Sequence, residues 1–172
     1  LAGEPLIALG RDNDDWQSRT RDLDLFHDRW QRGDWTILTR GRGVFCGVHY
    51  DPHAGRLSLI ADKLGLRPLY YHVNDQYVTF ASALRIFESL VDIIKNMDVR
   101  AVTEMVGLGF PLGGRTPYQN IARLKPSEIV QFTAKNISRW QYWRWDDIPI
   151  SHNPEATLLK QVYDEFTAAL GR

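Results

Sequence analysis

The sequence predicts an α+β domain built in layers, and three observations support this prediction. Short apolar runs separated by turn residues are typical of a meander of strands, and they lie at 56–61, 69–73 and 76–81. Further strand-like runs occur on both sides of this stretch. The helical segments are amphipathic, so each can lay one face on a sheet; the longest cover 22–33, 98–108 and 154–170.

The elements before residue 56 follow from periodicity and turn chemistry. In chain order we expect a strand at 5–9, a helix at 22–33, strands at 35–38 and 43–50, and a turn at 51–55. Leu23, Phe26 and Trp30 fall on one face of the helix, and Gly33 suits its end. The strand at 43–50 alternates, with Val44, Cys46 and Val48 on one face and Phe45, Gly47 and His49 on the other.

A charged turn, Asp62 to Pro68, joins the first two strands of the central stretch. Gly65 permits a backbone angle that other residues resist. Pro68 fixes its own φ and pushes Arg67 toward an extended conformation. We therefore expect Asp62 and Arg67 to order this loop, with Gly65 at positive φ. These four residues are the structural motif of the chain.

The remaining elements are set by turn residues and helical spacing. Asn74-Asp75 predicts a two-residue hairpin loop, and Asp98 can cap a helix that runs to Leu108. The other predicted pieces are a short helix at 83–91, a Gly-rich loop at 111–115, a hairpin of strands at 129–132 and 137–142, a polar linker at 146–153, and a helix at 154–170. That last helix carries an apolar stripe of Leu158, Val162, Phe166 and Leu170.

Five segments resemble, in order, motifs of the glutamine amidotransferase domain of asparagine synthetases. DKLGLRPLYY, from Asp62, is similar to the family's Asp-x-x-Gly-x-x-Pro-Leu-Tyr-Tyr. GVFCGVHYD before it, and FASALRIFESL, RTPYQNIARLKPSEIVQF and YWRW after it, are similar to neighbouring family segments. The resemblance implies a four-layer α/β/β/α sandwich of the N-terminal-nucleophile hydrolase type, with mostly antiparallel sheets. It also implies a glutaminase-like domain at 1–145, whose first strands would lie before Leu1, followed by a linker at 146–153. Residues 154–172 would then be either the first helix of a synthetase domain or a helix that folds back on the glutaminase-like domain.

The resemblance assigns two candidate substrate-binding residues. The family's Asn-Gly-Glu segment, which binds glutamine, aligns with Leu9-Gly10-Arg11, so only Gly10 is kept. The family's Asp at the start of the next helix, which holds the glutamine amine, aligns with Asp22. An Asp at a helix start also stabilises the helix without any ligand. Two further departures are Ala83 for a Glu and Ser127 for a turn Gly.

No residue of the chain is predicted to be catalytic. In the family an N-terminal cysteine attacks the glutamine amide, with its own amine as base. The only thiol here is Cys46, in a strand between valines, and it is predicted to be a buried core residue. The sequence begins with Leu1 and is expected to be a piece of a longer protein.

Three functional hypotheses remain open. The first is a degenerate, non-hydrolysing domain that supports an ATP-using synthetase domain, as in relatives such as β-lactam synthetase and the lasso-peptide cyclases. The second is a working glutaminase whose cysteine lies upstream of Leu1 and which supplies ammonia for asparagine formation. The third is a free-standing binding module. The partners implied are glutamine if the site is intact, a synthetase domain in the same or a separate chain, and a second copy of this chain.

Composition excludes several other classes. Lys plus Arg and Asp plus Glu both number 21, so nothing favours nucleic acid or an anionic membrane as partner. No apolar run approaches the roughly 18 residues that cross a bilayer. A single cysteine forms no internal disulfide, which predicts a reducing cytoplasm. No Cys/His spacing suggests a metal site. No cofactor is expected in this chain, whereas ATP and Mg are implied for the synthetase domain.

Overall fold

The computed structural model describes residues 1–4, 7 and 16–170, with only the backbone for 16–20. Among the predicted features, Gly10 and the strand at 5–9, apart from Ile7, lie outside the described residues. No helix within the described ranges is long and apolar enough to cross a membrane.

Two antiparallel sheets form the middle of the molecule. Within the described residues, the first sheet has the order β1-β2-β3-β7-β8 and the second β5-β4-β6. The strands are β1 (Ala2–Gly3), β2 (Phe45–Asp51), β3 (Arg56–Ala61), β4 (Tyr70–Val73), β5 (Val78–Ala81), β6 (Ala122–Arg123), β7 (Glu128–Phe132) and β8 (Ile137–Gln141).

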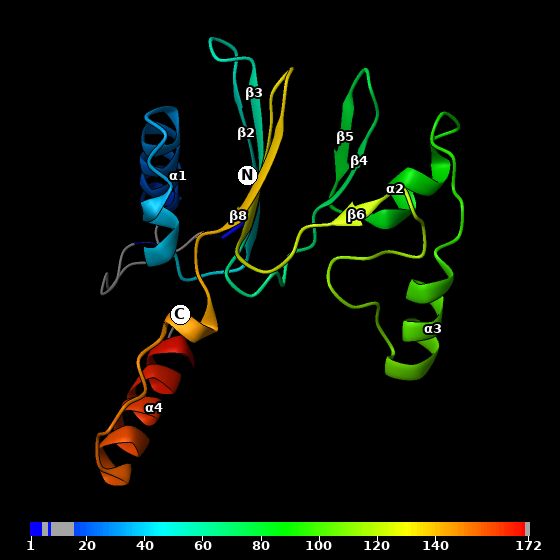
Figure 1. Cartoon of the computed structure of the whole chain (residues 1–172). Coiled ribbons are helices and arrows are strands. Elements are labelled where there is room, and N and C mark those ends of the chain that lie inside the picture. Colours follow the sequence, from blue (N-terminus) through cyan, green and yellow to red (C-terminus); the bar gives the residue numbers. More distant parts are fainter. Residues whose placement is uncertain (5–6, 8–15, 171–172) are drawn as a thin grey trace.

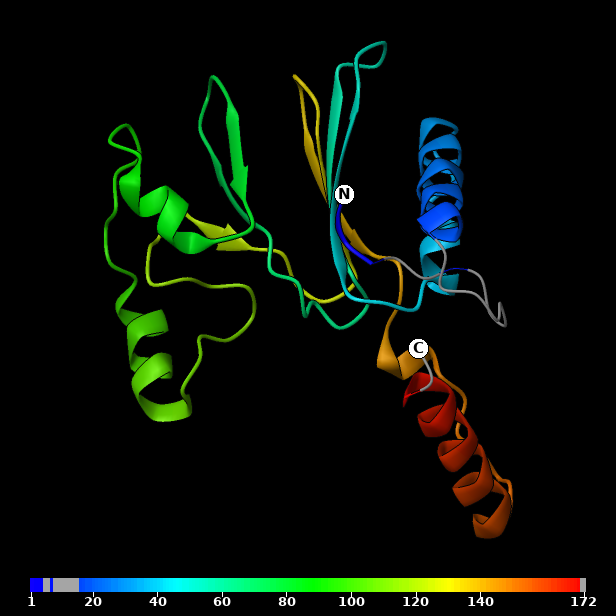
Figure 2. The same cartoon turned by 180° about the vertical axis from the view of Figure 1, so that it is seen from behind.

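Helices cover the outer side of each sheet. The helix α1 (Trp16–Gln31) lies beside the first sheet, and α2 (Leu84–Ser89) and α3 (Val99–Leu108) lie beyond the second (Figure 1). The same order of layers is visible from behind (Figure 2). The fold is therefore the four-layer α/β/β/α sandwich of the N-terminal-nucleophile hydrolase type that the sequence predicted.

Alternation along β2 separates two apolar clusters, as predicted. Cys46 packs between the sheets in a cluster whose other buried members are Leu59, Ala61, Leu69, Tyr71, Leu124, Val130 and Phe132. Phe45 belongs to the cluster under α1, whose other members are Ile7, Phe26, Trp30, Ile37, Leu38, Ile60 and Ile129. At Gly47 a Cβ atom would lie 3.2 Å from the ring of Trp30, so glycine lets this ring lie directly on the strand.

The first predicted helix was wrong in its start and in one of its core residues. It begins at Trp16, not at residue 22, so Asp22 lies inside the helix. Leu23 is exposed, whereas Asp22, Phe26 and Trp30 are buried at intervals of four residues. The face of α1 that packs on the sheet therefore includes the carboxylate of Asp22. Leu23 lies to one side of this face, because neighbouring positions of a helix are about 100° apart.

The predicted strand at 35–38 is instead a 3-10 helix, η1 (Thr36–Arg40). The carboxylate of Asp34 accepts hydrogen bonds from the backbone N–H and the hydroxyl of Thr36, at 3.0 and 2.5 Å. This local side-chain bond turns the backbone away from an extended path. The consecutive residues Ile37 and Leu38 are then both buried, which the alternation of a strand does not allow.

The hairpin between β4 and β5 is looser than predicted. Val73 pairs with Val78, so the loop spans residues 74–77. The side-chain oxygen of Asn74 accepts from the N–H groups of Gln76 and Tyr77, both at 2.9 Å. The Asn was thus a correct turn signal, but its side chain closes a longer loop than the two-residue one expected.

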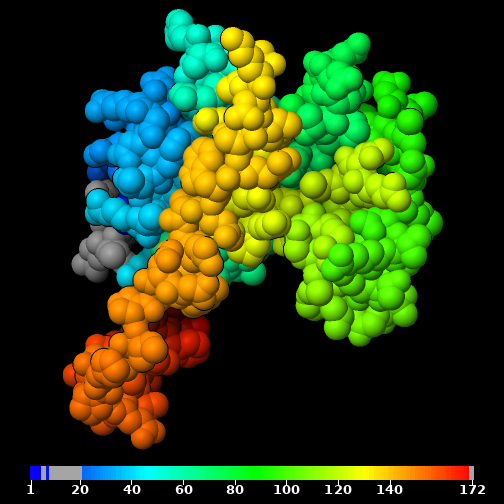
Figure 3. Space-filling model, viewed as in Figure 1, coloured from blue at the N-terminus to red at the C-terminus, as the bar shows by residue number. Residues whose placement is uncertain are grey.

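The second half of the chain follows its prediction more closely. Asp98 caps α3 by accepting from the N–H of Ala101 at 3.1 Å, and the late hairpin forms as β7 and β8. The predicted linker opens with a 3-10 turn, η2 (Trp145–Asp147), and α4 (Glu155–Leu170) ends the described chain. Figure 3 shows this last segment as an arm that projects from the body.

Candidate functional site

The carboxylate of Asp62 organises the loop that joins the two sheets. It is 1% exposed and accepts four backbone hydrogen bonds. Its Oδ1 accepts from the N–H of Leu64 at 3.0 Å and of Leu66 at 3.1 Å. Its Oδ2 accepts from the N–H of Arg67 at 3.1 Å and, across to β2, of Phe45 at 3.3 Å. One side chain therefore closes the loop and ties it to the neighbouring strand.

The same loop is clamped by residues that lie far along the chain. Gly65 has φ +62°, as predicted, and its carbonyl accepts from the guanidinium of Arg123 at 2.7 Å. The carbonyl of Asp62 accepts from the N–H of Ser127 at 2.8 Å. Ser127 itself has φ +54°, and its hydroxyl donates to the carbonyl of Trp143 at 2.5 Å. Replacing the family's turn glycine with Ser thus adds a hydrogen bond at a left-handed position.

Cys46 lies beside this loop and is chemically quiet. Burial raises the pKa of its thiol, and the nearby charge of Arg67 only partly opposes this effect. Since the thiolate is the nucleophilic form, a raised pKa makes Cys46 a poor nucleophile. Its place between the sheets agrees with the predicted core role.

Asp22 is in a different part of the molecule, on α1 at the outer side of the first sheet. Its Oδ2 accepts from the backbone N–H of Ile7 at 3.2 Å, and both residues are buried. The carboxylate therefore ties α1 to Ile7. Gly10, the other candidate substrate-binding residue, lies outside the described residues.

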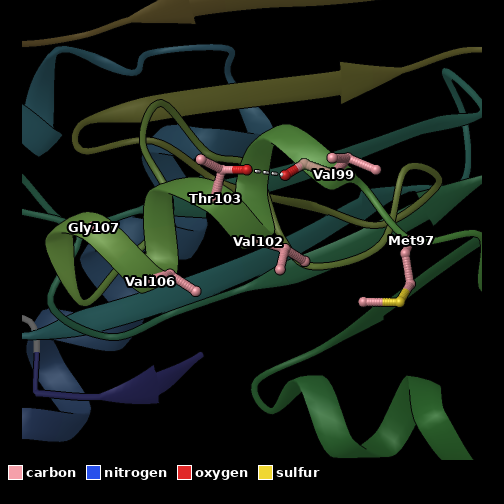
Figure 4. Close-up of a pocket in the computed structure, with 6 residues that line it drawn as sticks. All are labelled: Met97, Val99, Val102, Thr103, Val106 and Gly107. Carbon is pink, nitrogen blue, oxygen red and sulfur yellow. Dashed lines mark hydrogen bonds between the residues drawn. The ribbon is translucent and has the colours of Figure 1, made fainter.

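Sequence analysis missed an apolar groove of about 430 Å³ along α3. Figure 4 shows its lining, which consists of Met97, Val99, Val102, Thr103, Val106 and Gly107. The hydroxyl of Thr103 donates to the carbonyl of Val99 at 2.9 Å. Because free glutamine carries a charged ammonium and a charged carboxylate group, a groove without any charged lining residue does not suit it. The helical spacing of the valines was the signal for this groove.

The predicted residues therefore form two separate groups. Asp62, Gly65, Arg67 and Pro68 build one loop at the junction of the sheets, with Cys46 beside it. Asp22 lies with α1, on the opposite face of the first sheet from Cys46. Nowhere in the described part of the chain do three or more Cys, His, Asp or Glu side chains gather as metal ligands.

Comparison with known proteins places these features in a family. Residues 8–143 match the glutamine amidotransferase domain family. The chain is 26% identical over 132 residues to asparagine synthetase [glutamine-hydrolyzing] 3 of Bacillus subtilis, covering 73% of this chain and 20% of that protein. It is 27% identical over 111 residues to a protein of Methanocaldococcus jannaschii provisionally named asparagine synthetase [glutamine-hydrolyzing] 2. This match covers 62% of this chain and 21% of that protein. The chain thus spans about a fifth of the length of these relatives.

Proposed function

This chain belongs to the glutamine amidotransferase domain family of the asparagine synthetase type, and we propose that it is a form that does not hydrolyse glutamine. Its role is to support an ATP-dependent synthetase domain that forms an amide. The observation that carries this proposal is the replacement of the family's Asn-Gly-Glu by Leu9-Gly10-Arg11.

The replaced residues are those that the family uses on glutamine. A Leu side chain donates no hydrogen bond to a developing oxyanion, and loss of one such donor lowers a rate on the order of a hundredfold or more. Arg11 brings a positive charge in place of a carboxylate. Cys46 offers no substitute nucleophile, because it is buried and its pKa is raised.

Asp22 supports the same proposal from the structural side. Its carboxylate is buried and already accepts from the N–H of Ile7. We propose that this bond, which holds α1 against the preceding segment, is the main role of Asp22 in this chain. A glutamine amine at this position would be left with the other carboxylate oxygen, Oδ1, of a side chain that is already buried.

The expected result of the direct test is no glutamate release from glutamine above background, for this chain or for the full encoded protein. The informative variants restore the family residues, Leu9→Asn with Arg11→Glu, and they are compared with Cys46→Ala. Glutamate release that is lost in Cys46→Ala would contradict the proposal and make Cys46 the nucleophile.

The alternative is a working glutaminase that supplies ammonia for asparagine formation and whose cysteine lies upstream of Leu1. It is favoured by one observation, the presence of Asp22 at the position that aligns with the family's amine-binding Asp. In that case the full protein releases glutamate, Cys46→Ala leaves the rate unchanged, and an electrophilic glutamine analogue blocks it.

The division of the chain belongs to the same proposal. We propose that 1–145 is the glutaminase-like domain, that 146–153 is the linker, and that 154–172 is the first helix of the synthetase domain. ATP and Mg would bind to the synthetase domain. What supports this is the exposure of α4. Leu159, Val162, Tyr163, Phe166 and Leu170 are all exposed, and the ion pair of Glu165 with Arg42, at 3.1 Å, is a surface contact worth little. An uncovered apolar stripe of this kind marks an interface.

We expect α4 to exchange its amide hydrogens rapidly when this chain is studied alone. A helix of this length without tertiary packing is marginal in water, whereas β3 and β7 lie in the middle of a sheet. Hydrogen exchange across 155–170, compared with 56–61 and 128–132, measures this difference. Protection of α4 as strong as that of the two strands would show that it docks on the body instead.

A further inference from the structure

His49 lies among three aromatic rings, an aromatic cage between α1 and the first sheet. The side chain is 6% exposed. Its ring centroid lies 6.0 Å from those of His27 and Trp30, both on α1, and 6.3 Å from that of Trp35, which precedes η1. All three rings meet it edge to face, so the imidazole is one of the surfaces on which α1 rests.

This cage suits a neutral imidazole better than a charged one. An imidazolium has two N–H donors, and the cage is poor in acceptors. Even the indole N–H of Trp30, which is buried, finds no hydrogen-bond partner in the described part of the chain. An imidazolium with so little exposed surface loses most of its hydration, which is costly.

The charged groups around His49 give it little compensation. Its own strand carries Asp51, but that carboxylate already accepts from the guanidinium of Arg56 at 3.2 Å and from the N–H groups of His53 and Ala54. From β3 the guanidinium of Arg56 repels a proton on His49, and from α1 His27 does the same. Burial first, and His27 next, lower the pKa of His49, while Asp51 opposes them.

We propose that the contact between α1 and the first sheet is a proton-sensitive latch, closed while His49 is neutral and released when mild acid charges it. Protonation would put a positive charge among the rings that hold α1 on β2. Movement of α1 away from β2 would return this charge to water. The two sheets need not unfold for this movement.

The latch acts on more than the helix itself. The carboxylate of Asp22, on α1, accepts from the N–H of Ile7, so release of α1 also breaks this buried hydrogen bond.

The direction of the pH effect follows from linkage. A histidine whose pKa is lowered by folding gives its stabilisation in full above its unfolded pKa of about 6.5. The stabilisation is lost as pH falls from there through the lower folded pKa, because the released state binds the extra proton. The closed latch is therefore the state above about pH 6.5, and opening is expected on acidification below it.

The test is hydrogen exchange of α1 at pH 7.5 and pH 5.5, corrected for the intrinsic rate at each pH. In the wild type, we expect α1 to lose protection at pH 5.5 relative to β3 and β7. The variant His49→Phe keeps an aromatic ring in the cage and should abolish this loss. His27→Gln changes only an exposed residue and should reduce it, and it remains informative if His49→Phe fails to fold. His152→Gln, in the linker, is the matched control and should behave as wild type.

A site-specific readout makes the result unambiguous. In an NMR titration, the imidazole of His49 should take up its proton below about pH 6.5, the ordinary value for a histidine. The proposal is overturned if His49 titrates at or above that pH, or if α1 loses equal protection in wild type, His49→Phe and His27→Gln. No glutamine is present in these measurements, so their outcome is separate from that of the glutamate-release assay.

Discussion

Asp62→Ala is expected to lower the free energy of unfolding by about 3–4 kcal/mol, the largest effect of any single substitution considered. The variant would leave four backbone N–H groups without their acceptor. The N–H of Phe45 is buried and cannot turn to water, whereas those in the loop are partly accessible. The cost is therefore less than four times that of one buried donor. Urea unfolding at neutral pH measures the change.

Asp51→Ala provides the matched control. Asp51 also accepts two loop N–H groups, from His53 and Ala54, but it does so at an exposed turn. Water can replace it there, and we expect a loss of about 1 kcal/mol. Equal losses in the two variants would show that burial of the Asp62 carboxylate does not set its importance. Asp62→Asn keeps one acceptor oxygen and should fall between wild type and Asp62→Ala.

Gly65→Val is expected to cost about 2–3 kcal/mol, from two separate causes. A β-branched residue at φ +62° is strained by roughly 1–2 kcal/mol. The new Cβ would also lie 3.2 Å from the Cα and N atoms of Pro126, which are backbone atoms and cannot move aside easily. Thermal unfolding, converted to a free energy at neutral pH, gives the magnitude.

Gly55→Val separates these two causes. Gly55 has φ +55°, but no atom lies within 4 Å of the position of its Cβ. This variant should therefore show the backbone strain alone. The difference between the two variants reports the contact with Pro126, by which the loop packs on the segment before β7. Identical losses would mean that this packing adds nothing.

Most of the strands were predictable because their signals are local. The run 56–61 became β3 without change, and alternation in 43–50 gave the two faces of β2. The failures also have local causes. At 35–38 apolar β-formers outweighed Asp34, whose carboxylate bends the chain, and at Asn74 the side chain bonds to residues two and three positions on instead of closing a two-residue loop.

The candidate site was predictable only in part. The resemblance located Asp62, Gly65, Arg67 and Pro68 in one loop, and the left-handed angle of Gly65 followed from its neighbours. The position of Asp22 did not follow, because the start of an amphipathic helix depends on what its first turns contact. The cage of His49 was also invisible, since its three rings come from α1 and from Trp35, both distant in sequence from His49.

The sequence by itself determined the family and the two-sheet architecture, because motifs, alternation and turn residues act over a few neighbouring positions. Only the tertiary structure decided which polar groups are buried, and against what. The sequence neighbours of Asp22, His49 and Asp62 do not show which groups these three side chains contact. Their chemistry diverges because folding gives Asp62 four donors, Asp22 the N–H of Ile7, and His49 a cage of rings. Burial makes the free energy of a polar group depend on its partners, and those partners come from distant parts of the chain.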